Sequence, residues 1–184
     1  MIDLKKYGIE LDIVRHGEYL PTKVGGWTDD HLSNNGVKQI ESLIEQLDDN
    51  YDIFISSDLN RAKESADILN KKLQMNIVYD FSIREINSGI LNDMSIEDFY
   101  NKYPGMFFQT LEMDESFPEG ESPNSFYERV KNAFIRILDE NRNKKILMVT
   151  HGGVITIIYC LLNGYKYSNK MQIDIKTGSI TKFR

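Results

Sequence analysis

The sequence predicts an α/β fold: a three-layer α/β/α arrangement with a mostly parallel central sheet and an irregular lid insertion. Short apolar runs that are typical of buried strands alternate along the chain with segments whose apolar residues recur at helical spacing. Such alternation favours parallel strands joined by helices that cover both faces of the sheet. The length of 184 residues and the apolar share of 41% suit a single domain spanning 1–184.

Four strands are expected. Residues 10–14, 52–56, 75–78 and 146–149 are short apolar runs, each bounded by polar or turn-forming residues. Because the segments between them carry helical patterns, we expect these strands to run mostly parallel.

Helices are expected after the first, second and fourth strands, and one more before the fourth. Each is recognised by apolar residues at helical spacing: Val37, Ile40, Ile44 and Leu47; Ala62, Ala66, Leu69 and Leu73; Phe126, Val130, Phe134, Ile137 and Leu138; and the apolar run 154–162. The third of these has a clear start, with Ser122 as the N-cap and Pro123 at the first helical position.

The region from about 95 to 122 breaks the alternation. It contains Pro104, Pro118 and several large apolar side chains, and the overlapping stretch 103–128 carries six acidic residues and no basic one. Long irregular connections in compact domains are usually functional. We therefore expect a lid insertion at about 95–122.

Composition excludes several classes of protein. The net charge is −6, which argues against non-specific nucleic-acid binding, and Cys160 is the single cysteine, so no internal disulfide or CxxC pair can form. Charges interrupt the only apolar stretch near the N-terminus, so we expect neither a signal peptide nor a membrane span, and a cytoplasmic location. The sequence has no metal-ligand spacing, phosphate-binding P-loop or GxSxG elbow, which predicts no metal and no cofactor.

Polar chemistry follows three of the expected strands. Arg15 and His16 come after the first strand, Ser57 after the second, and His151 after the fourth. In open α/β sheets ligands bind beyond the carboxyl ends of the strands, so these side chains should meet at one edge. A neutral imidazole can attack phosphorus, a second, protonated imidazole can hold phosphate oxygens, and an arginine fork suits phosphate.

Three further residues are weaker candidates when each is considered alone. Arg61 lies in the first turn of the second helix, where it can reach the same edge, although an arginine there is more often a surface residue. Glu85 can serve as a general acid if it lies in a cleft, but most glutamates are solvated. His31 lies in a polar turn and is expected to be a surface residue.

Taken together, these motifs resemble the histidine phosphatase superfamily, in its phosphoglycerate-mutase-like branch and most closely its compact phosphatases. Six segments match in order along most of the chain: RHGE at 15–18, GWTDDHLSNNG at 26–36, SSDLNRAKESA at 56–66, REINSG at 84–89, GES at 120–122 and THGGV at 150–154. The third segment has Ser65 where the family pattern has threonine.

The resemblance implies roles for five catalytic residues. His16 would be the nucleophile that takes the phosphoryl group. Arg15, Arg61 and His151 would form a positive pocket around the phosphate oxygens. Glu85 would protonate the leaving oxygen and then help water attack the phosphohistidine. Phosphoryl transfer depends mainly on positioning and charge stabilisation, so these cations require no metal.

The resemblance also implies a set of substrate-binding positions: Gly17, Thr22, Gly26 and Gly152. Backbone N–H groups near Gly17 and Gly152 would assist the cations. Thr22 stands where the family often has an asparagine, within a loop that is shorter than usual.

The implied function is phosphomonoester hydrolysis on a small-molecule substrate. The short chain favours a phosphatase, and the acidic 103–128 stretch would disfavour a second anionic group, which suggests α-ribazole phosphate or a broad range of monophosphates. Two alternatives remain open: a phosphoglycerate mutase, and a non-catalytic member that binds phosphorylated ligands. We expect no nucleic-acid or membrane partner, and a homodimer is left open.

Overall fold

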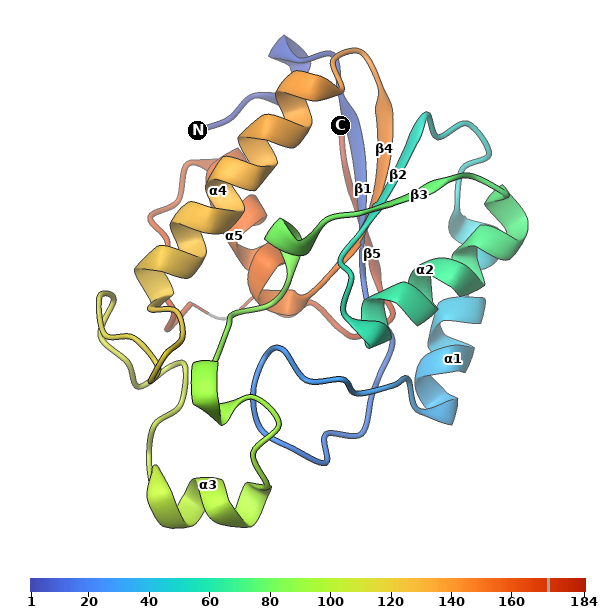
Figure 1. Cartoon of the computed structure of the whole chain (residues 1–184). Helices are drawn as coiled ribbons and strands as arrows, with labels where there is room; N and C mark the ends of the chain where they lie inside the picture. The colour runs from blue at the N-terminus through green and yellow to red at the C-terminus, as the bar shows by residue number, and fades with distance from the viewer. Residues whose placement is uncertain (172) are drawn as a thin grey trace.

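A five-stranded sheet forms the centre of the computed structural model, which describes residues 1–171 and 173–184 (Figure 1). The strands are β1 (Glu10–Arg15), β2 (Ile53–Ser56), β3 (Ile77–Tyr79), β4 (Lys145–Thr150) and β5 (Ile180–Phe183), in the spatial order β3-β2-β4-β1-β5. The first four are parallel, which confirms the mostly parallel sheet, and β5 runs antiparallel to β1 at the edge. This fifth strand was not expected, because its four residues include the polar Thr181 and Lys182.

Helices cover both faces of this sheet, as the predicted three-layer arrangement requires. They are α1 (Asn34–Glu41), α2 (Asn60–Leu73), α3 (Ile96–Lys102), α4 (Pro123–Glu140) and α5 (Gly152–Asn163), with short 3-10 turns at Leu4–Lys6, Ile44–Gln46, Phe81–Ile83 and Gly89–Leu91. In Figure 1, α4 and α5 lie on one side of the sheet and α1 and α2 on the other. No helix in the described ranges is both long and apolar enough to cross a membrane.

Strand side chains that alternate between the two faces create two cores. Ile13 of β1 and Met148 of β4 belong to the core that includes α4 and α5. Val14 and Val149, their neighbours along the strands, belong to the core that includes α1 and α2. Successive residues of a strand point to opposite faces, so these nearly continuous apolar runs are buried on both sides.

The strand register brings the three polar strand ends to one edge. Arg15 of β1 lies opposite Thr150 of β4, and Ser56 of β2 lies opposite Val149. The residues that follow these strands therefore emerge side by side, at the end of the sheet where α3 also lies in Figure 1.

Two predicted segments differ from the structure. The first helix ends at Glu41 and resumes as a 3-10 turn at Ile44–Gln46, with the Ser42 hydroxyl bonded to the carbonyl of Gln39. The 95–122 segment is not wholly irregular, because Ser95 caps the short helix α3. Three of its side chains, Phe99, Leu111 and Phe117, are buried in the core, which anchors the segment. By contrast, α4 begins at Ser122 and Pro123 as predicted.

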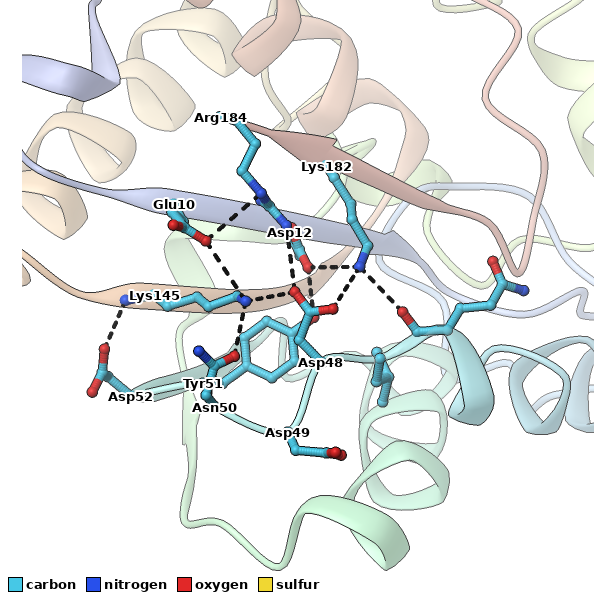
Figure 2. A network of polar contacts seen from close by, with 12 residues as sticks. Glu10, Asp12, Asp48, Asp49, Asn50, Tyr51, Asp52, Lys145, Lys182 and Arg184 are labelled. Atoms are coloured by element: carbon cyan, nitrogen blue, oxygen red, sulfur yellow. Dashed lines mark hydrogen bonds and ion pairs between the residues drawn. The ribbon is translucent and has the colours of Figure 1, made fainter.

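A polar network closes the opposite end of the sheet (Figure 2). The fully buried Asp12 of β1 accepts hydrogen bonds from the Tyr51 hydroxyl at 2.5 Å and from Arg184 at 2.6 Å. Asp48 bridges Lys145 of β4 and Lys182 of β5, and hydrogen bonds from these lysines lower the pKa of Asp48 to about 2. The network thus ties the edge strand β5 to the parallel sheet, away from the polar strand ends.

Candidate active site

Two histidines from distant parts of the chain meet at the polar edge. His16 directly follows β1 and His151 is the N-cap of α5, after β4. Their ring centroids are 5.0 Å apart, with the planes tilted by 55°. Both side chains are buried, with 3% and 0% of their surface exposed. The structure therefore places the two predicted histidines together.

The His16 ring is held in one orientation. Its Nδ1 lies 2.8 Å from the carbonyl oxygen of Gly17, and the edge of the ring meets Tyr19 at a centroid distance of 5.5 Å. A carbonyl can only accept a hydrogen bond, so Nδ1 carries the hydrogen. Nε2 therefore keeps its lone pair, and an atom of this kind can act as a nucleophile.

Burial keeps both imidazoles neutral in the free protein. Burial first, and then the positive charge of Arg61, lowers the pKa of His16 to about 3. The same causes, in the same order, hold the pKa of His151 well below its usual value. The second histidine thus differs from the expected imidazolium: it offers a neutral N–H. The Ser57 hydroxyl lies 2.7 Å from His151 Nε2, and by donating to it can leave the hydrogen on Nδ1.

Arg61 is a buried cation without a carboxylate partner. It is 2% exposed, and in the described ranges it takes part in no ion pair. Its guanidinium donates to the carbonyls of Gly26 at 2.6 Å and Thr28 at 3.2 Å, and lies 4.9 Å from the centre of the Tyr19 ring. Burial lowers the pKa of Arg61 because desolvation disfavours its charge. An uncompensated buried charge is costly, so this position favours an anion.

Unpartnered polar atoms mark where that anion would lie. Four buried side-chain atoms of the described residues have no hydrogen-bond partner there: Arg15 Nε, Arg61 Nε, His151 Nδ1 and the Tyr167 hydroxyl. The first three are donors that belong to the predicted phosphate pocket. Buried polar groups are nearly always paired, so three orphaned donors in one place indicate a site prepared for an oxyanion.

The carboxylate of Glu85 lies beside this pocket. It lines a cavity of about 790 Å³ together with Arg15, Gly152 and Gly153. Glu85 Oε2 accepts a hydrogen bond from the Gly153 N–H at 3.1 Å. A side chain at Gly153 would place its Cβ only 2.3 Å from Glu85 Oε1, so the glycine is what allows the carboxylate to approach α5.

Arg129 of α4 fixes the backbone of the Glu85 segment. It donates to the carbonyls of Ser82, Arg84 and Glu85 at 2.9, 3.1 and 3.0 Å. The carboxylate of Glu121 pairs with the same guanidinium at 2.6 and 2.8 Å. Sequence reasoning missed this arginine, because no motif includes it.

The three glycines among the four expected substrate-binding positions divide between two roles. Gly152 lines the cavity. Gly17 already donates its N–H to Ser65 at 3.1 Å, and its missing side chain allows contact with the backbone of Gly36. Gly26 supports Arg61 through its carbonyl. These two glycines therefore build the pocket rather than face the ligand.

Thr22 lies outside the cavity. It is exposed and lines a separate depression with Asp29 and His31. The structure therefore gives no support to Thr22 as a residue of the cavity that Arg15 and Glu85 line. His31 is exposed and paired with Glu64, as expected of a surface residue.

The acidic residues of 103–128 do not face the cavity. None of the six is among the residues that line it. Glu112, Asp114, Glu115 and Glu119 are exposed, Glu121 is paired with Arg129, and Glu128 is paired with Lys131. The expectation that they repel a second anionic group at the site is therefore wrong. The 95–122 segment instead contributes Phe108 and Gln109 to the cavity wall.

Several lining residues come from the chain after α5, which carried no motif. Tyr167, Asn169, Met171 and Asp174 line the cavity, and the carbonyl of Ile175 accepts a short hydrogen bond from Arg15. Ser57, by contrast, was expected at this edge of the sheet, and its hydroxyl meets His151 there. In the described ranges, no group of three His, Cys, Asp or Glu side chains is arranged to hold a metal ion.

Comparison with known proteins agrees with this geometry. A chain 32% identical over 159 residues, covering 82% of this chain and 69% of its own, is the phosphoglycerate mutase-like protein 4 of Arabidopsis thaliana. Phosphoserine phosphatase 1 of Hydrogenobacter thermophilus is 30% identical over 166 residues, with coverage of 87% and 79%. The structure of the α-ribazole phosphatase from Shigella flexneri superposes with a TM-score of 0.82 at 22% identity, covering 94% of this chain and 89% of that one.

The family itself is identified by a match along nearly the whole chain. Residues 11–184 match the model of the histidine phosphatase superfamily, branch 1. This confirms the resemblance inferred from the six motifs. The chain therefore belongs to branch 1 of the histidine phosphatase superfamily and is a phosphatase that acts on phosphomonoesters.

Proposed function

We propose that His16 is the nucleophile and that the protein hydrolyses small-molecule phosphomonoesters through a phosphohistidine formed on its Nε2. The observation that carries this proposal is the set of buried, unpartnered donors on Arg15, Arg61 and His151 next to a histidine whose Nε2 is free. Two arginines that have no carboxylate partner in the described part of the chain suit a dianionic phosphate, and the neutral His16 is ready to attack.

The reaction has two balanced steps. In the first, the lone pair of His16 Nε2 attacks phosphorus, the ester P–O bond breaks, and Glu85 gives its proton to the leaving alkoxide. In the second, Glu85 takes a proton from water, the oxygen attacks phosphorus, and the P–N bond breaks to return neutral His16 and phosphate. Arg15, Arg61 and His151 stabilise the charge on the phosphoryl oxygens throughout.

The low pKa of His16 supports this role. An imidazole with a pKa of about 3 is unprotonated at neutral pH, so no proton has to be removed before attack. The same positive surroundings that lower this pKa stabilise the phosphoryl group once it is bound.

We further propose that the alcohol part of the substrate carries no second phosphate or carboxylate. Arg15 is the only cationic side chain among the described residues that line the cavity, and the phosphate uses it. The remaining wall combines the acids Glu85 and Asp174 with apolar groups such as Phe108. In this proposal the 95–122 segment is a lid that covers the alcohol part.

Two relatives suggest esters on which to test this selectivity. α-Ribazole phosphate, the substrate in the description of the S. flexneri enzyme, has no second anionic group and is the candidate we favour within a broad range of monophosphates. Phosphoserine, named for the H. thermophilus relative, carries a carboxylate and should be a poorer substrate. Values of kcat/KM on both compounds decide the point, and a clear preference for phosphoserine contradicts the proposal.

The mutase alternative is tested separately. The A. thaliana relative is named for phosphoglycerate mutase, an activity whose substrates carry a carboxylate beside the phosphate. The scarcity of cations in the cavity disfavours such substrates. Conversion of 3-phosphoglycerate to 2-phosphoglycerate in the presence of 2,3-bisphosphoglycerate, at a rate above that of phosphate release, would establish the mutase.

The nucleophile is tested by replacing histidines one at a time. His16→Ala should lower p-nitrophenyl phosphate hydrolysis by about 10³-fold or more and abolish the phosphoenzyme seen by intact-mass measurement. His31→Ala is the matched control, because His31 is exposed and distant from the cavity, and it should keep activity within about twofold. Unchanged turnover in a folded His16→Ala protein would favour the non-catalytic alternative or another nucleophile.

A further inference from the structure

The cavity holds one buried polar group that the proposed mechanism does not use. Tyr167 is 8% exposed and lines the cavity together with Arg15 and Glu85. Its hydroxyl has no hydrogen-bond partner among the described residues. The other three orphaned atoms of this kind are the phosphate donors on Arg15, Arg61 and His151, so Tyr167 is the one left without a ligand.

The Tyr167 ring is held in place. It stacks on Tyr127 of α4, with the ring centroids 5.1 Å apart and the planes 13° from parallel. Burial, and next the negative charge of Glu85, raises the pKa of Tyr167, so its hydroxyl keeps its proton and remains a hydrogen-bond donor. Both groups line the same cavity.

The wall around Tyr167 is fixed as well. Asn169, which lines the same cavity, donates from its side-chain amide to the carbonyls of Phe108 at 2.6 Å and Leu111 at 2.9 Å. These contacts tie the chain after α5 to the 95–122 segment. The hydroxyl of Tyr167 therefore belongs to a built wall rather than to a loose loop.

The position of this donor indicates which part of the substrate it meets. The phosphate oxygens already have donors on His151 and the two arginines, whereas Glu85 acts on the ester oxygen of the leaving alcohol. Tyr167 lines the same cavity as Glu85, so the alcohol part that leaves next to Glu85 is the part of the substrate within reach of its hydroxyl. A buried hydroxyl without a partner is costly, and a ligand oxygen relieves that cost.

We infer that the Tyr167 hydroxyl donates a hydrogen bond to a hydroxyl or ring oxygen of the substrate alcohol, and so selects sugar-like phosphomonoesters over apolar esters of the same shape. Sites built to hydrogen-bond a substrate oxygen discriminate against analogues that lack it, because the protein group is then left unpaired. This inference rests on the proposed function, because it assumes that Glu85 marks the leaving-group side.

The test compares Tyr167→Phe with wild-type protein on two esters that share a five-membered ring. Methyl ribofuranoside 5-phosphate carries hydroxyl and ring oxygens on its alcohol part, and cyclopentylmethyl phosphate carries neither. Wild-type protein should prefer the riboside. Tyr167→Phe should lose about five- to tenfold in kcat/KM on the riboside and change less than about twofold on the carbocycle, with its pH profile unchanged. Tyr165→Phe is the matched control, because Tyr165 is exposed and does not line the cavity, and it should change neither value.

Two results from the variant overturn the inference. Equal losses on both esters mean that Tyr167 acts through Glu85 or the fold, and no loss on either means that its hydroxyl does not contact the substrate. If Tyr167→Phe fails to fold, the wild-type preference still decides: equal kcat/KM on the two esters overturns the inference.

The failure of the proposed function gives a different result. If p-nitrophenyl phosphate is hydrolysed in a His16-dependent way but the riboside is not preferred, only the inference fails. If none of the three esters shows His16-dependent turnover, the proposed function fails and the inference fails with it.

Discussion

Replacing Gly153 by alanine should displace the proposed general acid without unfolding the protein. The added Cβ would lie 2.3 Å from Glu85 Oε1 and 3.0 Å from a ring carbon of Phe126, which is fully buried. Ordinary contact begins near 3.4 Å, so 3.4 − 2.3 leaves 1.1 Å by which the flexible carboxylate has to retreat. Alanine also favours helix over glycine by roughly 1 kcal/mol, which helps the variant to fold.

The magnitude follows from the role of Glu85. A displacement of about 1 Å can cost about 10²-fold, and general acid catalysis as a whole contributes about 10²- to 10⁴-fold. We therefore expect Gly153→Ala to lower kcat/KM by about 10²-fold on an alkyl phosphate, whose alkoxide needs a proton to leave. p-Nitrophenolate leaves without one, so the loss on p-nitrophenyl phosphate should stay below about tenfold.

Gly152→Ala is the matched control. Its Cβ would lie 3.2 Å from the guanidinium carbon of Arg15, which contacts the phosphate common to both substrates. Losses in this variant should therefore be equal for the two esters. Equal losses in Gly153→Ala, or none, would refute the assignment of Glu85 as the acid that protonates the leaving group.

The remaining predictions concern protonation and stability. In an NMR titration between about pH 5 and 8, His31 should be the one histidine that titrates, with its pKa raised by Glu64. The buried His16 and His151 should stay neutral over this range, and a second titrating imidazole would contradict the prediction. Because these two have folded-state pKa values below 6.5, the unfolded chain binds more protons below pH 6.5. The free energy of unfolding in urea should therefore fall as pH drops from about 6.5 toward 3, by up to about 1.4 kcal/mol per pH unit for each histidine. His16→Asn should reduce the slope of this dependence, and an unchanged slope would contradict the role given to His16. Asp12→Ala should lower the free energy of unfolding by about 2–3 kcal/mol; the loss is limited because its partner Arg184 is partly exposed and can be solvated. The variant should keep the wild-type kcat at 25 °C, and a large loss of kcat would show coupling across the sheet.

Local patterns were sufficient for much of the fold. Four strands and the N-cap of α4 at Ser122 follow from apolar runs and capping chemistry, which act over a few residues. The edge strand β5 could not be found in this way. It depends on pairing with β1 and on the Lys182 and Arg184 contacts to Asp12, more than 160 residues away.

The residues of the candidate site also divide into those that local motifs identify and those that only long-range contacts reveal. His16, His151, Arg15, Arg61 and Glu85 were recognised because short motifs carry them. One of their supporting residues was not recognised: Arg129, which holds the Glu85 backbone. Ser57 was expected at the same edge of the sheet, but its hydrogen bond to His151 was not. A hydrogen bond between segments that are far apart in the sequence produces no motif or periodicity in either segment, so it cannot be predicted from local patterns.

Residue types and their spacing were enough to predict the chemistry of this protein: a sheet whose strand ends deliver two histidines and an arginine, and motifs that identify a phosphatase. How that chemistry is tuned depends on the folded chain. Burial makes both histidines neutral, Arg61 has no counter-ion among the described residues, and the acids of 103–128 do not line the cavity. Each residue contributes its own functional groups wherever it stands in the chain. Which of these groups are buried, which line the cavity and which form pairs depends on segments that meet only in the folded chain.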